Sequence, residues 1–82
     1  MLNPDKLNNI LEEVRHEAGR ACSLHAPMNS LHEAYAVILE EMDELWDEVK
    51  KNHRKHPDRD RLARIEARQV AAMAIRLIHD LL

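Results

Sequence analysis

Acidic side chains in the stretch "AVILEEMDELWDEVKK", residues 36–51, have the type and spacing for metal-ion chemistry. At about 100° per residue, Glu41 lies between Val37 and Leu45 on a helical projection. Glu44 follows on the same margin of the apolar face. This arrangement places carboxylates next to the surface that the helix needs to bury.

The stretch "EARQVAAMAIRLIHDL" repeats this arrangement near the C-terminus. Glu66 falls between Leu62 and Val70, and Gln69 lies nearly one turn further on. An unpaired carboxylate in apolar surroundings is costly, so it takes up a proton, pairs with a cationic side chain or binds a metal ion. Two helices that each offer an inward acid, with a second oxygen ligand three residues on, can surround a hard cation. Oxygen ligands favour Mg²⁺ or Mn²⁺ over Zn²⁺.

A second interpretation of these acids needs no metal. They could pair with arginine at a contact between helices, or lie at a wet edge of the core. On spacing alone this interpretation is favoured, because charged residues often flank an apolar stripe.

The elements that position these side chains are predicted to be helices. The 82 residues fit one domain, and they include one glycine, no phenylalanine and only one tyrosine and one tryptophan, which argues against a β-fold. Apolar residues recur at steps of three and four, which predicts an all-α domain spanning 1–82 with helices at about 4–21, 30–52 and 58–82.

Helix-start signals support these boundaries. Asn3 followed by Pro4 is typical of a first helical turn, and Ser30 with Glu33 fits a capping box. Gly19 weakens the end of the first helix, and Pro57 lies in the charged segment that follows the second.

The third predicted helix is apolar on most of its circumference from Val70 onward. A helix of this kind must be covered on nearly all sides, which two neighbouring helices cannot do. We therefore expect a homo-oligomer, a dimer or tetramer, in which three-helix protomers form a four-helix-bundle-type core with the third helix at its centre.

Charge and cysteine content narrow the class of protein further. A net charge of −3 gives no general attraction for nucleic acid or acidic lipid. No apolar run approaches the roughly 20 residues that cross a bilayer. A single cysteine and the lack of a secretory leader predict a cytoplasmic protein.

Two motifs resemble those of a known family. "EEMDE" (40–44) is similar to the EExxE motif of the MazG-like all-α nucleoside triphosphate pyrophosphohydrolases, and "EARQ" (66–69) resembles the ExxD motif of their later helix. The resemblance covers about residues 30–82. It implies that Glu41, Glu44 and Glu66 match metal-binding and catalytic glutamates, and that Gln69, a further metal ligand, stands where the family usually has aspartate.

The resemblance implies an Mg²⁺-dependent enzyme, with Mn²⁺ as a possible substitute. Such an enzyme cleaves a nucleoside triphosphate between the α- and β-phosphates, giving monophosphate and pyrophosphate. Because an amide brings no negative charge, the change at Gln69 leaves an alternative open. In that alternative the chain is a non-catalytic helical oligomer, either a binding or regulatory module or a relative of the family whose activity was lost with the aspartate.

Three further residues are weaker candidates for contacting a substrate. Lys50 and Lys51 belong to a basic cluster that could contact a triphosphate, although a solvated loop is the favoured interpretation. Trp46 could stack on a base, but a tryptophan at helical spacing is more often used in packing. The six histidines form no HExxH motif, so they are interpreted as surface residues.

Overall fold

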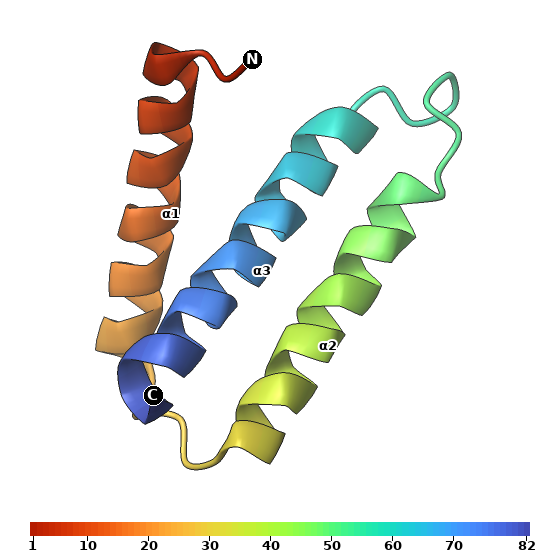
Figure 1. The fold of residues 1–82 in the computed structure, drawn as a ribbon. Coiled ribbons are helices and arrows are strands. Elements are labelled where there is room, and N and C mark those ends of the chain that lie inside the picture. Colours follow the sequence, from red (N-terminus) through yellow and green to blue (C-terminus); the bar gives the residue numbers. More distant parts are fainter.

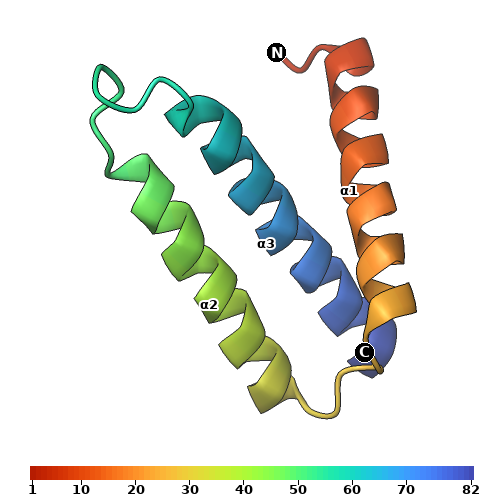
Figure 2. The ribbon, with the colours of Figure 1, turned by 180° about the vertical axis from the view of Figure 1, so that it is seen from behind.

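The computed structural model describes all 82 residues and contains three helices and no strands. They are α1 (Pro4–Leu24), α2 (Leu31–Val49) and α3 (Arg59–Leu81). The all-α prediction with three helices is confirmed. In Figures 1 and 2, α3 lies between the other two helices; it packs against both, whereas α1 and α2 do not pack against each other.

The helix starts follow from the capping residues. The Asn3 side chain accepts a hydrogen bond from the Lys6 backbone N–H at 3.1 Å, and Ser30 Oγ accepts one from the Glu33 N–H at 3.0 Å. Asp58 precedes α3 without a side-chain cap and instead lies 3.6 Å from Arg61. The first two helices therefore begin at residues whose side chains satisfy an exposed backbone donor.

Two helix ends differ from the sequence prediction. α1 continues to Leu24 rather than stopping near residue 21, because Gly19 keeps helical geometry and Ser23 Oγ donates to the Arg20 carbonyl at 2.8 Å. α2 ends at Val49 rather than near residue 52. There the chain turns, and Asn52 accepts the backbone N–H groups of the residues that follow it.

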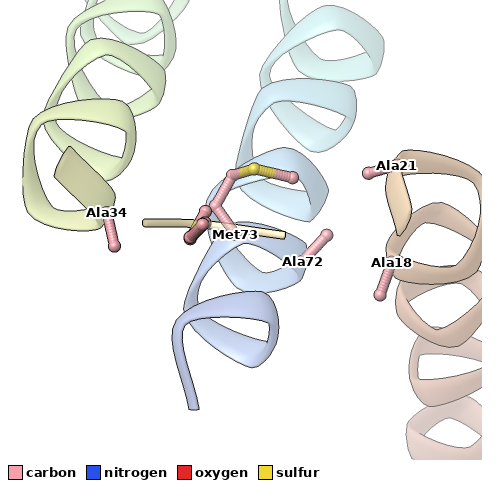
Figure 3. Packing of buried hydrophobic residues seen from close by; sticks show 6 residues of the cluster. Ala18, Ala21, Ala34, Ala72 and Met73 are labelled. Carbon is pink, nitrogen blue, oxygen red and sulfur yellow. The ribbon is translucent and has the colours of Figure 1, made fainter. Parts of the chain in front are cut away.

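The core is small and is built mainly from alanine and methionine. Its buried members come from all three helices and the α1–α2 connector: Ala18, Ala21, Met28, Ala34, Ala72 and Met73. Figure 3 shows Ala72 and Met73 of α3 in the middle, with Ala34 of α2 on one side and Ala18 and Ala21 of α1 on the other. Small side chains let the helices approach closely, but they bury little apolar surface in a protein that has no large fully buried side chain.

The C-terminal end of α3 holds the α1–α2 connector in place. Arg76 Nη2 donates to the Ala26 carbonyl at 3.0 Å, and Asp80 Oδ2 accepts the Met28 N–H at 3.0 Å. The two side chains lie 3.8 Å apart and both are almost completely buried. This polar clamp, Arg76 and Asp80, satisfies backbone groups that would otherwise be buried without partners.

The apolar belt predicted for α3 divides into covered and uncovered residues. Met73 is buried, Val70, Leu77 and Leu81 are half-buried, and Ala74 and Ile78 are exposed. Most of the belt is therefore used within the protomer, against α2 and the core. None of the three helices carries an apolar stretch of the length that a membrane crossing requires.

Candidate metal centre

Three glutamates from two helices meet on the inner side of α2. Glu41 and Glu44 lie nearly one turn apart on α2, and Glu66 faces them from α3. Each offers a carboxylate oxygen, and these oxygens lie within 4.8 Å of one another. Glu41 and Glu66 are partly buried, whereas Glu44 is exposed. This set is called the acid cluster below.

The electrostatics of the acid cluster are unfavourable without a cation. Partial burial, followed by the charges of Glu44 and Glu66, raises the pKa of Glu41 from its usual 4.5 to about 7. The pKa of Glu66 is also raised, first by burial and then by Glu44. No arginine or lysine forms an ion pair with any of the three. Neighbouring carboxylates with raised pKa values and no cationic partner are typical of functional sites rather than structural ion pairs.

The donor set fits a hard divalent cation. It consists of three carboxylates, which supply oxygen atoms only, and the exposed Glu44 keeps the cluster accessible to water. Mg²⁺ is bound in this way, through one or a few carboxylates, several waters and substrate phosphates. The residues present therefore fit Mg²⁺ or Mn²⁺ better than Zn²⁺, which takes nitrogen and sulfur ligands.

The acid cluster opens into a groove of about 540 Å³ between α1 and α2, with α3 as its floor. This volume lies within the range that small-molecule sites occupy. Glu17 and Arg20 of α1 form one wall, and Arg76 lies about 15 Å along α3 from Glu66. The groove therefore combines a carboxylate end with a region that contains two guanidinium groups.

Gln69 lies in the same groove but is engaged with α1. A hydrogen bond from Gln69 contributes to lowering the pKa of Glu17, although the main cause is the hydrogen bond from Arg20. Arg20 donates to both carboxylate oxygens of Glu17, at 2.7 and 3.2 Å. Gln69 therefore lies close to Glu17, and its carbonyl oxygen is the one ligand atom that it could offer to a cation.

The weaker substrate candidates lie outside the groove. Trp46 is 59% exposed on the opposite side of α2, as its projection of about 140° from Glu41 requires. Lys50 pairs with Asp47 at 3.1 Å, and Lys51 pairs with Glu48 at 2.8 Å. The structure does not bring these three residues together with the acid cluster.

Sequence reasoning did not identify Glu17 or Arg76, although both line the groove and are among the most buried polar residues. The signal for Glu17 was present: on a helical projection it lies within about 60° of Val14 and Ala21. The same reasoning that identified Glu41 would have placed Glu17 beside the buried face. Arg76 carried no comparable signal, because its partner is a backbone carbonyl of the connector.

Comparisons of the chain with family models, with curated proteins and with solved structures gave no match.

Proposed function

We propose that the protein is an Mg²⁺-dependent pyrophosphohydrolase that cleaves nucleoside triphosphates between the α- and β-phosphates. The observation that carries this proposal is the acid cluster, in which Glu41, Glu44 and Glu66 approach one another at the mouth of a ligand-sized groove. The resemblance of "EEMDE" and "EARQ" to two motifs of the MazG-like family supports the same reaction.

Each part of the groove has a role in this proposal. Glu41, Glu44 and Glu66 hold Mg²⁺, with the Gln69 carbonyl as a neutral fourth oxygen. When bound, the cation supplies charge neutralisation of the phosphates and polarises the phosphorus–oxygen bond that breaks. Arg20 lies on the α1 wall of the same groove, where its guanidinium, paired with Glu17, is the cationic group that a polyanionic substrate would share.

The reaction needs one water molecule and one acceptor for its proton. Water attacks the α-phosphorus, the bond from this phosphorus to the bridging oxygen breaks, and pyrophosphate leaves. A carboxylate oxygen of the acid cluster that is not coordinated to the cation accepts the water proton. The products are nucleoside monophosphate and pyrophosphate, so charge and atoms balance without a covalent intermediate.

The test is release of pyrophosphate from a panel of ribo- and deoxynucleoside triphosphates with Mg²⁺. We expect Glu66→Gln to lower turnover by at least about 100-fold, because it removes one of the charges on the cation. Asp47→Asn is the matched control: it makes the same change of carboxylate to amide at an exposed acid of α2 that lies outside both motifs, and it should keep wild-type activity.

The outcomes of this assay separate the hypotheses. Orthophosphate release in place of pyrophosphate would mean that a different bond is broken. No product from any nucleotide would reject catalysis and favour the non-catalytic alternative, in which the chain is a helical binding or regulatory module. Binding of Mg²⁺ by the inactive protein would then assign the acid cluster to ligand binding alone.

A further inference from the structure

α2 carries a second, apolar surface on the side opposite the acid cluster. Its large side chains recur at steps of four, four, three, four and three residues, and each is between 45% and 66% exposed. We call this surface the outer stripe; its residues are Leu31, Tyr35, Leu39, Met42, Trp46 and Val49. On a helical projection they fall within about 80° of one another, so they form one continuous face.

Nothing in the chain covers the outer stripe. α3 packs on a different face of α2, where Ala34, about 100° round the helix from the centre of the stripe, is fully buried and Ile38 is half-buried, and α1 does not pack against α2 at all. Figures 1 and 2 agree that α2 forms one side of the molecule, with no element beyond it. The apolar face therefore meets solvent over the whole length of the helix.

The exposed area is large for a protein of this size. The accessible surface is 6319 Å² for a chain of 9.6 kDa, whereas a compact monomer of this mass exposes about 5,100 Å². The excess of about 1,200 Å² exceeds the roughly 800 Å² per partner that a standard stable interface covers. The protomer thus exposes enough surface for one full interface.

We propose that the outer stripe is the contact surface for a second copy of this chain, which packs α2 against α2. Steps of four and three residues are the repeat of a coiled-coil seam, in which each apolar side chain fits between those of a helix with the same repeat. A second copy supplies that repeat, and a two-fold axis pairs the stripe with itself. The interface lies on the opposite side of α2 from the groove, so the inference does not depend on the proposed enzyme activity.

This inference changes the expected centre of the oligomer from α3 to α2. The uncovered large apolar residues at the C-terminal end of α3 are fewer, namely Ile75 and Ile78 of the helix and Leu82, which follows it. Most of the α3 belt is already used against α2 and the core. The longer uncovered face belongs to α2.

The wild-type protein carries its own probe, because its single tryptophan, Trp46, lies in the outer stripe. The exposed apolar residues at the C-terminal end of α3 include no tryptophan. Light scattering gives the mass, while Trp46 emission and its quenching by acrylamide report whether the indole is covered. We expect twice the 9.6 kDa of one chain, with blue-shifted Trp46 emission and little quenching. A monomer, or an oligomer in which Trp46 is freely quenched, would overturn the proposal.

Two matched variants sharpen this test. Met42→Glu places a charge in the centre of the outer stripe and should raise the dimer dissociation constant by at least about 100-fold. Ile78→Glu makes the corresponding change at an exposed site on α3 and should leave the dissociation constant unchanged. The reverse result, with Ile78→Glu dissociating the protein and Met42→Glu not, would place the interface on α3. Circular dichroism of both variants checks that helix content is retained.

Discussion

Two polar clusters lie along α3, about ten residues apart, and they differ in how their charges are satisfied. At the C-terminal end, the polar clamp joins opposite charges: Arg76 and Asp80 contact each other and bind the backbone of the connector. The acid cluster joins like charges, and no protein cation neutralises it.

The pKa directions show the same contrast. The pKa of Asp80 is lowered, first by the hydrogen bond from His79 and then by that from the Met28 backbone, so the fold stabilises its charged form. The pKa of Glu41 is raised, so the fold opposes its charged form. The clamp therefore contributes to folding, whereas the acid cluster opposes it, and this repulsion is what the proposed cation would relieve.

The largest effect should follow from breaking the polar clamp. Arg76→Met leaves the Ala26 carbonyl without its donor and Asp80 without its neighbouring buried cation. We expect the free energy of unfolding to fall by about 2–4 kcal/mol. Arg64→Met is the control on the same helix, because Arg64 pairs with Glu13 of α1 at 2.8 Å but is half exposed. Its cost should stay below about 1 kcal/mol. Urea denaturation measures both values. Equal losses of unfolding free energy in the two variants would contradict the role given to the clamp.

A smaller effect should follow from adding the cation. If the acid cluster binds Mg²⁺ only in the folded state, Mg²⁺ at about 100 times its dissociation constant stabilises by about 2.7 kcal/mol. For a domain of this size that raises Tm by roughly 10–20 °C. Glu41→Gln should abolish the rise, and Asp47→Asn, at an exposed acid of α2 outside both motifs, should preserve it. Thermal melts at one fixed protein concentration measure this, and identical responses in all three proteins would place any Mg²⁺ site elsewhere.

The smallest effect concerns pH in the absence of metal. Because the folded-state pKa of Glu41 is raised from 4.5 to about 7, the folded protein binds more protons than the unfolded chain between these values. The contribution of Glu41 to stability should therefore be largest at and below about pH 4.5, and it should fall as the pH rises to about 7.

Since solvent reaches part of the groove, the loss should be on the order of 1–2 kcal/mol rather than the full value that the shift implies. Urea denaturation from pH 4.5 to 8 measures it. Glu41→Gln should remove this contribution and make the apo protein more stable than wild type at pH 7.5. The opposite result is a wild-type free energy of unfolding that rises from pH 4.5 to 8, together with a Glu41→Gln variant that is less stable than wild type. It would show that the charge of Glu41 does not destabilise the fold.

The elements of the fold were predictable because each carries local signals. Asn3 and Ser30 cap helices whose apolar residues repeat at helical spacing, and the proximity of Glu41 and Glu66 follows from their places beside the buried faces. Gly19 misled the prediction of the α1 end, because one glycine costs a helix only about 1 kcal/mol. The Arg76 contact with Ala26 joins residues 50 positions apart, and periodicity within one helix carries no information about such a pair.

The apolar residues of the outer stripe also repeat at helical spacing in the sequence. On a helical projection of α2 they overlap with the apolar residues that pack against α3. At helical spacing Leu31 and Val49 fall within about 20° of the half-buried Ile38, whereas about half of each side chain is exposed. A helix with apolar residues on two faces gives a single broad pattern. Only the packing of α3 on one side of α2 separates the residues that are covered from those that are not.

The alanine-lined contact between α1 and α3 has a consequence for the order in which parts of the molecule open. α1 is held by Val14, Ala18 and Ala21, and its first turns are largely solvent-exposed apart from half-buried Leu7 and Ile10. Local opening therefore costs least in the N-terminal half of α1, and backbone amide hydrogens should exchange there first and in the middle of α3 last. Since Glu17 and Arg20 form a wall of the groove, an opening that reaches them widens the path by which a ligand enters and leaves.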